Sequence, residues 1–203
     1  MTAPVVVAGL VGYLAGSVST AVLVARARGV DLRSVGSGNP GASNAGRALG
    51  RRTGLAIGLV DALKGLLPAA GFGQLDHRAG LVAGSAAVLG HVTSPWLHGR
   101  GGKGVATAFG AVLGSHPLWA PVALLVWLAG LAGTRWIALA SVAAALSLPV
   151  TAVLATADVQ DRLWAALIAL VVVVRHRGNL AGRPRRPQST GRGPRRPHRR
   201  PRS

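Results

Sequence analysis

The 203-residue chain combines an apolar composition with a strong positive charge: 50% of its residues are hydrophobic, and its net charge is +18. Charged residues make up only 14% of the chain, against about 25% in an ordinary soluble domain, which argues against a soluble globular fold. The high hydrophobicity excludes disorder of the whole chain. The absence of Cys excludes disulfides and thiolate chemistry. These features indicate a polytopic membrane protein.

Seven apolar stretches approach the roughly 20 residues that a helix needs to cross a membrane. They lie at about 4–25, 54–73, 79–97, 104–117, 118–133, 136–157 and 162–174. The pair His116-Pro117 predicts a turn between the fourth and the fifth, and no basic segment precedes the first, which favours an uncleaved helix. The sequence therefore predicts an all-α fold, a polytopic membrane protein with seven transmembrane helices.

The distribution of basic residues predicts the orientation. If there are seven spans, all but three of the 23 Lys and Arg residues fall on one side; the exceptions are Lys64, Arg78 and Arg162. Because Lys and Arg concentrate in cytoplasmic segments, we expect the N-terminus outside and the C-terminus in the cytoplasm.

Two regions are expected along the chain: an integral membrane domain at 1–180 and a disordered, Arg- and Pro-rich cytoplasmic tail at 181–203. Such a tail can contact anionic lipid headgroups through charge alone. It has no aromatic residue on which bases could stack, so specific binding of nucleic acid is not expected.

Three polar clusters fall on the predicted cytoplasmic face: GSGNPGASNAGR (36–47), HGRGGKG (98–104) and RHRGN (175–179). Glycine lets the backbone approach an anion and direct N–H groups at it, while Arg and Lys supply positive charge. Taken singly, each cluster is equally typical of a tight turn or of an orientation signal. Together they indicate phosphate recognition at the membrane surface.

Other familiar site patterns are absent or weak. GGKG lacks the spacing of a nucleotide P-loop, and no His is followed by Asp at the five-residue distance found in many acyltransferases. With no acidic cluster, neither a metal nor a cofactor is expected. Asp61 and Lys64 are three residues apart and share a helix face, as a structural ion pair or as part of a polar site, and His91 is expected to hydrogen-bond within the bundle.

Five segments in order resemble the signatures of bacterial acyl-phosphate:glycerol-3-phosphate acyltransferases, the PlsY family. They are GSGNPGASNAGR, DALKG (61–65), GHVTSPWLHGRGGKGVATAFG (90–110), TRW (134–136) and HRGN (176–179), and the resemblance covers about residues 8–182. It implies a seven-helix enzyme of phospholipid biosynthesis in the bacterial inner membrane, with its active site on the cytoplasmic side. Such an enzyme transfers a fatty acyl group from acyl phosphate to the 1-hydroxyl of glycerol 3-phosphate, giving lysophosphatidic acid and phosphate without a cofactor.

The resemblance also implies roles for individual residues. Ser37 and Arg47 would bind glycerol 3-phosphate, Lys103 would neutralise phosphate charge, and His176 and Asn179 would orient the glycerol. The proton of the attacking hydroxyl would pass to His176 or to a phosphate oxygen of a substrate. The pocket for acyl phosphate would be shaped by Asn39, Gly41, Ser43, Asn44, Gly101, Gly102 and Gly104, with Ser141 as a further candidate.

Two positions depart from the family pattern. Gly178 stands where the family has Glu, which puts the placement of His176 and Asn179 in question, and Ser43 replaces Thr but keeps the hydroxyl. Two alternatives to the enzyme therefore stay open: an anion- or phosphate-binding membrane transporter, and an inactive relative of the acyltransferases.

Overall fold

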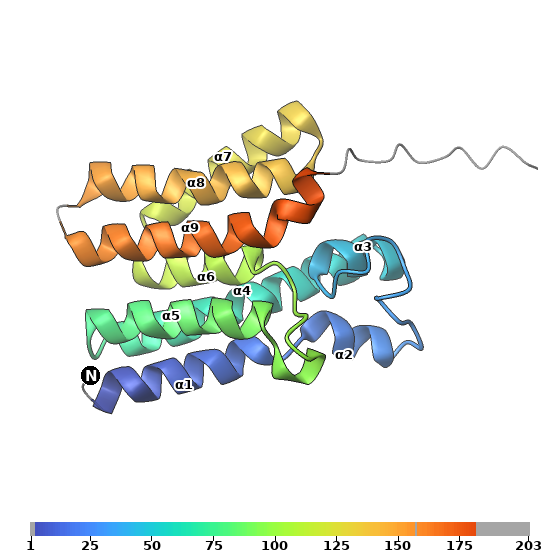
Figure 1. Ribbon diagram of the computed structural model, residues 1–203, viewed down its shortest axis with the longest axis horizontal. Helices are drawn as coiled ribbons and strands as arrows, with labels where there is room; N and C mark the ends of the chain where they lie inside the picture. Colours follow the sequence, from blue (N-terminus) through green and yellow to red (C-terminus); the bar gives the residue numbers. More distant parts are fainter. Residues whose placement is uncertain (1–2, 157, 182–203) are drawn as a thin grey trace, which may run out of the picture.

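The computed structural model describes residues 3–156 and 158–181, and every regular element in these ranges is a helix, as the sequence predicts (Figure 1). The elements are α1 (Ala3–Ser17), α2 (Thr20–Arg26), α3 (Ala42–Leu49), α4 (Arg51–Gly73), α5 (His77–Val92), the short 3-10 helix η1 (Pro95–Leu97), α6 (Val105–Ser115), α7 (Trp119–Thr134), α8 (Ile137–Ala155) and α9 (Val159–Leu180). Apart from Ala181, the predicted tail lies outside the described residues.

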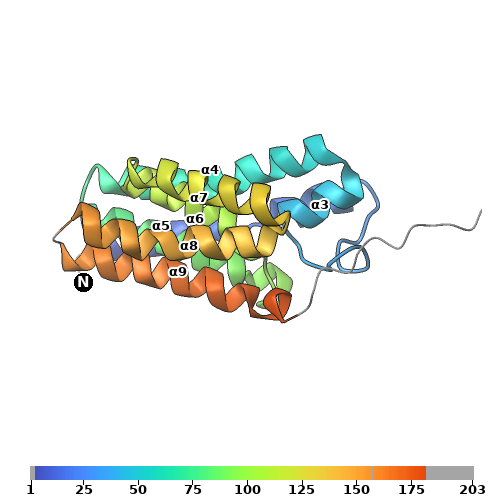
Figure 2. The same cartoon turned by 90° about the horizontal axis from the view of Figure 1, so that it is seen from above.

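The long helices run side by side along one axis, as Figures 1 and 2 show from two directions. Helix α1 packs on α5, α4 on α5 and α6, and α8 on α7 and α9. Four helical segments of the described chain are long and apolar enough to cross a membrane: Ala3–Arg26, Arg51–Gly73, Ile137–Ala155 and Val159–Leu180. Helices α6 and α7 are also apolar but shorter.

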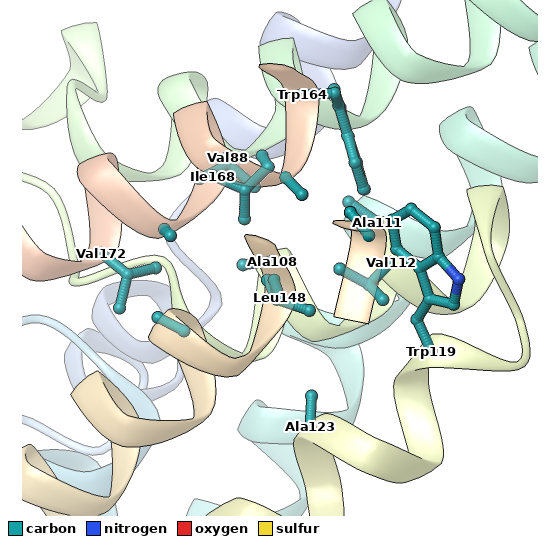
Figure 3. Packing of buried hydrophobic residues seen from close by; sticks show 14 of the residues in the cluster. Val88, Ala108, Ala111, Val112, Trp119, Ala123, Leu148, Trp164, Ile168 and Val172 are labelled. Atoms are coloured by element: carbon teal, nitrogen blue, oxygen red, sulfur yellow. The ribbon is translucent and has the colours of Figure 1, made fainter. Parts of the chain in front are cut away.

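Small side chains fill the interior of the bundle, while large apolar side chains cover its outside. Ala is the commonest residue of the buried core, beside larger residues such as Val112, Ile168 and Trp164 (Figure 3). By contrast, Leu10, Leu118 and Leu154 are exposed, the last two by more than four fifths. This distribution fits a lipid environment, where exposing Leu costs nothing and helices associate through close contact of small residues.

Glycines set the closest helix contacts. A Cβ at Gly12 or Gly16 of α1 would collide with the carbonyl groups of Ala83 and Ala87 on α5. Gly12 and Gly16 are four residues apart, the spacing that lets two membrane helices approach closely. The contact fixes α5, whose C-terminal end leads into the HGRGGKG segment.

The predicted first span, 4–25, matches the apolar segment Ala3–Arg26, but two helices form it, because the chain breaks between α1 and α2. Ser19 caps the new helix by accepting a hydrogen bond from the Val22 N–H (3.4 Å). The carbonyls freed by the break also find partners: Ser94 Oγ donates to the Ser17 carbonyl and Lys64 Nζ to the Val18 carbonyl, each at 2.6 Å. A broken helix is tolerated at membrane depth only when such groups are satisfied.

Two other predicted boundaries are corrected. The third span, 79–97, ends as an α-helix at Val92, and the turn that follows contains Pro95, which has no N–H to continue the ladder. The seventh, 162–174, is longer: α9 runs to Leu180, so RHRGN forms helical turns. The predicted turn at His116-Pro117 is confirmed, since it lies between α6 and α7.

Candidate functional site

The three Gly-rich, cationic clusters of the sequence lie at the same end of the bundle. The segment after α2 with α3, the loop between η1 and α6, and the last turns of α9 all lie at the right of Figure 1. Side chains join them directly: Arg33 Nη2 donates to the Leu97 carbonyl at 3.3 Å, and Arg175 donates to the loop before α6. Segments far apart in the sequence therefore build one surface.

Asn44 organises the first cluster. Its side chain is buried, its Oδ1 accepts a hydrogen bond from the Ser37 N–H (2.9 Å), and its Nδ2 donates to the Leu32 and Val35 carbonyls at 3.0 Å each. Gly36 has a φ of +57°, and a Cβ there would collide with Asn44 Oδ1. The Asn44 side chain thus holds the backbone of the loop at 32–37 by hydrogen bonds, while the Ser37 side chain stays exposed.

Arg175 braces the second cluster, although the sequence reasoning did not include it among the site residues. Its Nη2 donates to the carbonyls of Gly101 (2.9 Å) and Gly102 (3.1 Å). Both glycines are buried against α5, where a Cβ at Gly102 would collide with the His91 ring. The only sequence signal for Arg175 was its place at the start of RHRGN.

Lys103 lies where positive charges from three clusters converge. Partial burial lowers the pKa of its ammonium group, and the charges of Arg47 and Arg175 lower that pKa further. Among the described residues, no carboxylate forms an ion pair with any of these three cations. Cations held together without a carboxylate partner favour binding of an anion.

His176 is buried on α9, and it is close enough to Lys103 and Arg175 to interact with their positive charges. Its Nδ1 lies 2.8 Å from the Val172 carbonyl. A carbonyl only accepts hydrogen bonds, so Nδ1 carries a proton and, in the neutral ring, Nε2 keeps its lone pair. The fixed tautomer makes Nε2 available as a proton acceptor.

The other predicted residues divide into two groups. Asn39, Gly41 and Ser43 lie with Asn44 in the first cluster, Gly104 immediately precedes α6, and Asn179 is half-buried on α9. Ser141 differs, because its hydroxyl donates to the Ile137 carbonyl (2.8 Å) and accepts from Trp127 Nε1 (3.2 Å), which links α7 to α8. Its place in an acyl phosphate pocket stays a prediction.

Gly178 does not interrupt the helix that carries the third cluster. It is exposed in α9, nothing lies within 4 Å of a Cβ placed there, and helical structure continues through Leu180. A helical Gly costs about 1 kcal/mol relative to Ala, but the Val172 contact still anchors the His176 ring. The missing Glu side chain therefore leaves His176 in place.

A separate cavity of about 370 Å³ lies between α2 and α4. Its lining includes apolar Val24, Ile57 and Val60 together with Arg28 and Arg52. None of the predicted site residues lines it, so it is distinct from the convergence of cations at Lys103.

Comparison with known proteins points to one family. A family model described as glycerol-3-phosphate acyltransferase matches residues 6–183. The glycerol-3-phosphate acyltransferase of Geobacter sulfurreducens is 45% identical over 84% of this chain and 89% of that protein, and the one of Aquifex aeolicus is 40% identical over 83% and 89%.

Two solved crystal structures point to the same family. A crystal structure of PlsY, an integral membrane glycerol 3-phosphate acyltransferase, in its glycerol 3-phosphate form has a TM-score of 0.84 and 36% identity, covering 87% of this chain and 90% of that chain. The lysophosphatidic acid form gives a TM-score of 0.81 and 34% identity over the same shares.

We predict that Asn44→Ala destabilises the protein by about 1–3 kcal/mol, because the Ser37 N–H and the Leu32 carbonyl lose their partner. The Val35 carbonyl loses the Asn44 amide but keeps its hydrogen bond from the Gly38 N–H (3.0 Å). Asn44→Asp keeps an acceptor but loses the amide donor, so it should be destabilised as well. Thermal unfolding in detergent measures both, with Ser43→Ala, the exposed neighbour, as a control of unchanged stability. Wild-type unfolding temperatures for both Asn44 variants would contradict this role.

Proposed function

The chain belongs to the glycerol-3-phosphate acyltransferase family, and we propose that it transfers a fatty acyl group from acyl phosphate to the 1-hydroxyl of glycerol 3-phosphate. Lysophosphatidic acid and inorganic phosphate are the products. The observation that carries the proposal is the convergence of Arg47, Lys103 and Arg175 at one end of the bundle. Both substrates carry phosphate, and an uncompensated positive cluster favours two such anions.

We propose that the protein crosses the bacterial inner membrane seven times, with α1 and α2 together forming the first span and α4 to α9 the other six. The site end faces the cytoplasm in this arrangement. Support comes from the basic residues: the segments after α2, η1 and α7 and the C-terminal end of α9 all lie at the site end, and Lys and Arg concentrate in cytoplasmic segments.

Each cluster then has a part in substrate binding. Ser37 and Arg47 bind the phosphate of glycerol 3-phosphate, Asn179 orients its glycerol, and Lys103 neutralises phosphate charge between the two substrates. The loop held by Asn44 and the glycines braced by Arg175 shape the acyl phosphate pocket. The short glycine loop brings backbone close to the phosphate without side chains in between.

The reaction needs positioning more than strong acid or base. The hydroxyl oxygen of glycerol 3-phosphate attacks the acyl carbonyl carbon, the bond from that carbon to the phosphate oxygen breaks, and phosphate leaves with the electron pair. Holding the two substrates together lowers the barrier, and Lys103 stabilises the negative charge that develops on the phosphate. Acyl phosphate is a mixed anhydride, so phosphate is a good leaving group.

The hydroxyl proton passes to Nε2 of His176 in this proposal. Because Nδ1 donates to the Val172 carbonyl (2.8 Å), Nε2 is the nitrogen that can accept a proton. The proton acceptor can alternatively be a phosphate oxygen, and the activity of His176→Ala separates the two: general base catalysis contributes about 100-fold or more.

The direct test supplies palmitoyl phosphate and glycerol 3-phosphate to the purified protein and follows phosphate release together with lysophosphatidic acid. We expect turnover in the wild type and a loss of roughly 100-fold or more in Ser37→Ala, Arg47→Ala and Lys103→Ala. Ser37 and Arg47 hold the phosphate of glycerol 3-phosphate and so position its hydroxyl, and Lys103 stabilises the charge that develops on the leaving phosphate. Arg51→Ala, an exposed cation at the same end, is the matched control with retained activity.

Two results would overturn this proposal. Near-normal turnover in all three site variants would place the chemistry elsewhere. A folded wild type that binds or moves phosphate without acyl transfer would favour the transporter, and one that does neither would favour the inactive relative.

A pH dependence follows from the lowered pKa of Lys103, which has burial as its main cause. As the pH rises, Lys103 loses its charge earlier than an ordinary lysine with a pKa of about 10.4. The KM for glycerol 3-phosphate should therefore increase at a pH below the ordinary lysine pKa of about 10.4. The phosphate is already a dianion above neutral pH, since its second pKa is about 6. Lys103→Arg keeps its charge in this range, so its KM should be flat, and equal slopes for the two proteins would contradict the assignment.

A further inference from the structure

Three potential metal ligands meet at the end of the bundle opposite the phosphate site. His77 begins α5, His116 follows α6, and Asp161 lies in the first turn of α9. Asp161 Oδ1 is 2.6 Å from His77 Nε2 and 3.2 Å from His116 Nε2, and one ligand atom of each residue lies within 4.8 Å of the others. Figure 1 places the starts of α5 and α9 at the left, away from α3.

The charge of Asp161 lacks a permanent partner. The carboxylate is buried, and among the described residues it forms ion pairs only with the two histidines, not with Lys or Arg. A buried carboxylate needs a hydrogen-bonded or charged partner, because desolvation disfavours its ionised form. A histidine supplies a full positive charge only when it is protonated.

His116 gives a second, independent indication of a missing partner. Its side chain is nine-tenths buried, Nδ1 has no hydrogen-bond partner among the described residues, and the one polar atom near Nε2 in that part of the chain is Asp161 Oδ1, at 3.2 Å. A neutral imidazole has one N–H and one lone pair. If Nε2 carries the lone pair, it faces a negative oxygen, whereas a cation between the two atoms would satisfy both.

We propose that His77, His116 and Asp161 bind a divalent transition-metal ion, with zinc as the representative. Two imidazoles and one carboxylate form a donor set that zinc accepts, with metal–ligand distances of about 2.0–2.2 Å. Tetrahedral ligands at that distance are roughly 3.3–3.5 Å apart, and the 3.2 Å between His116 and Asp161 is close to this value. His77 must shift away from its 2.6 Å contact with Asp161 Oδ1 and toward His116, because the three ligand atoms spread over as much as 4.8 Å. This movement releases the proton that His77 shares with Asp161.

The surroundings suit such a site. The His116 ring stacks on Trp119, with ring centroids 3.8 Å apart and an interplanar angle of 14°, which fixes its orientation. His77 is half-exposed, so it can move, and the open side leaves room for water as a fourth ligand. Bound metal would join the start of α5, the turn after α6 and the start of α9. The sequence predicts no metal because it has no acidic cluster; these three residues are 39 and 45 positions apart and meet only in the fold.

Metal binding is tested on the full chain in detergent, after removal of any affinity tag and dialysis against a chelator. Calorimetric titration with Zn²⁺ gives the stoichiometry and affinity, and the absorption spectrum with Co²⁺ reports a tetrahedral nitrogen and oxygen site. His77→Ala is the main variant because the residue is half-exposed, so folding should be retained. Asp161→Asn removes the charge at constant size, and His98→Ala removes an exposed histidine elsewhere.

We expect the wild type to bind one Zn²⁺ per chain, with a higher unfolding temperature in zinc, and His98→Ala to behave in the same way. His77→Ala and Asp161→Asn should each lose at least tenfold in affinity, together with the zinc-dependent rise in unfolding temperature. Wild-type binding no tighter than that of His77→Ala would overturn the proposal and leave a metal-free His–Asp–His hydrogen-bonded contact. Equal loss in His98→Ala would likewise place the metal elsewhere.

Discussion

The proposed phosphate site depends on the side chains that hydrogen-bond to the backbone carbonyls at the break between α1 and α2. In an apolar environment, unpaired backbone carbonyls are costly, and here Ser94 donates to the Ser17 carbonyl and Lys64 to the Val18 carbonyl at the break. Ser94 belongs to the turn that leads into the glycine loop, and Lys64 belongs to α4, where it also pairs with Asp61 at 2.6 Å. The first span, α4 and the loop are therefore fixed relative to one another, and the pair in α4 has a structural role.

Close packing of small residues fixes the first span against α5. Gly12 and Gly16 bring α1 against α5, and the buried glycines of the loop lie on the C-terminal end of the same helix. Arg175 then draws α9 onto the loop carbonyls. Positive charge collects where these elements meet, and the backbone contacts position it before a ligand arrives. The proposed anion site thus depends on packing as much as on its motif residues.

Much of this organisation was predictable from local patterns. Apolar length indicated the membrane helices, and Gly, Ser and Arg spacing indicated the phosphate clusters. The features that could not be predicted depend on contacts between separated segments. Asn44 donates a hydrogen bond to the Leu32 carbonyl of its own loop, and the Arg175 guanidinium donates to the Gly101 carbonyl. The break in the helix after Ser17 was also not predicted, since apolar residues continue through it in the sequence. The grouping of His77, His116 and Asp161 likewise exists only after folding.

The most direct test of the account asks whether the three clusters share one face of the membrane. The chain has no Cys, so single variants Ser37→Cys, Arg100→Cys and Gly178→Cys, with Leu75→Cys from the opposite end, can be labelled by an impermeant maleimide in sealed vesicles of known orientation. We expect the first three to react from the cytoplasmic side and Leu75→Cys from the other. Reaction of Ser37→Cys and Gly178→Cys from opposite sides would contradict a single site.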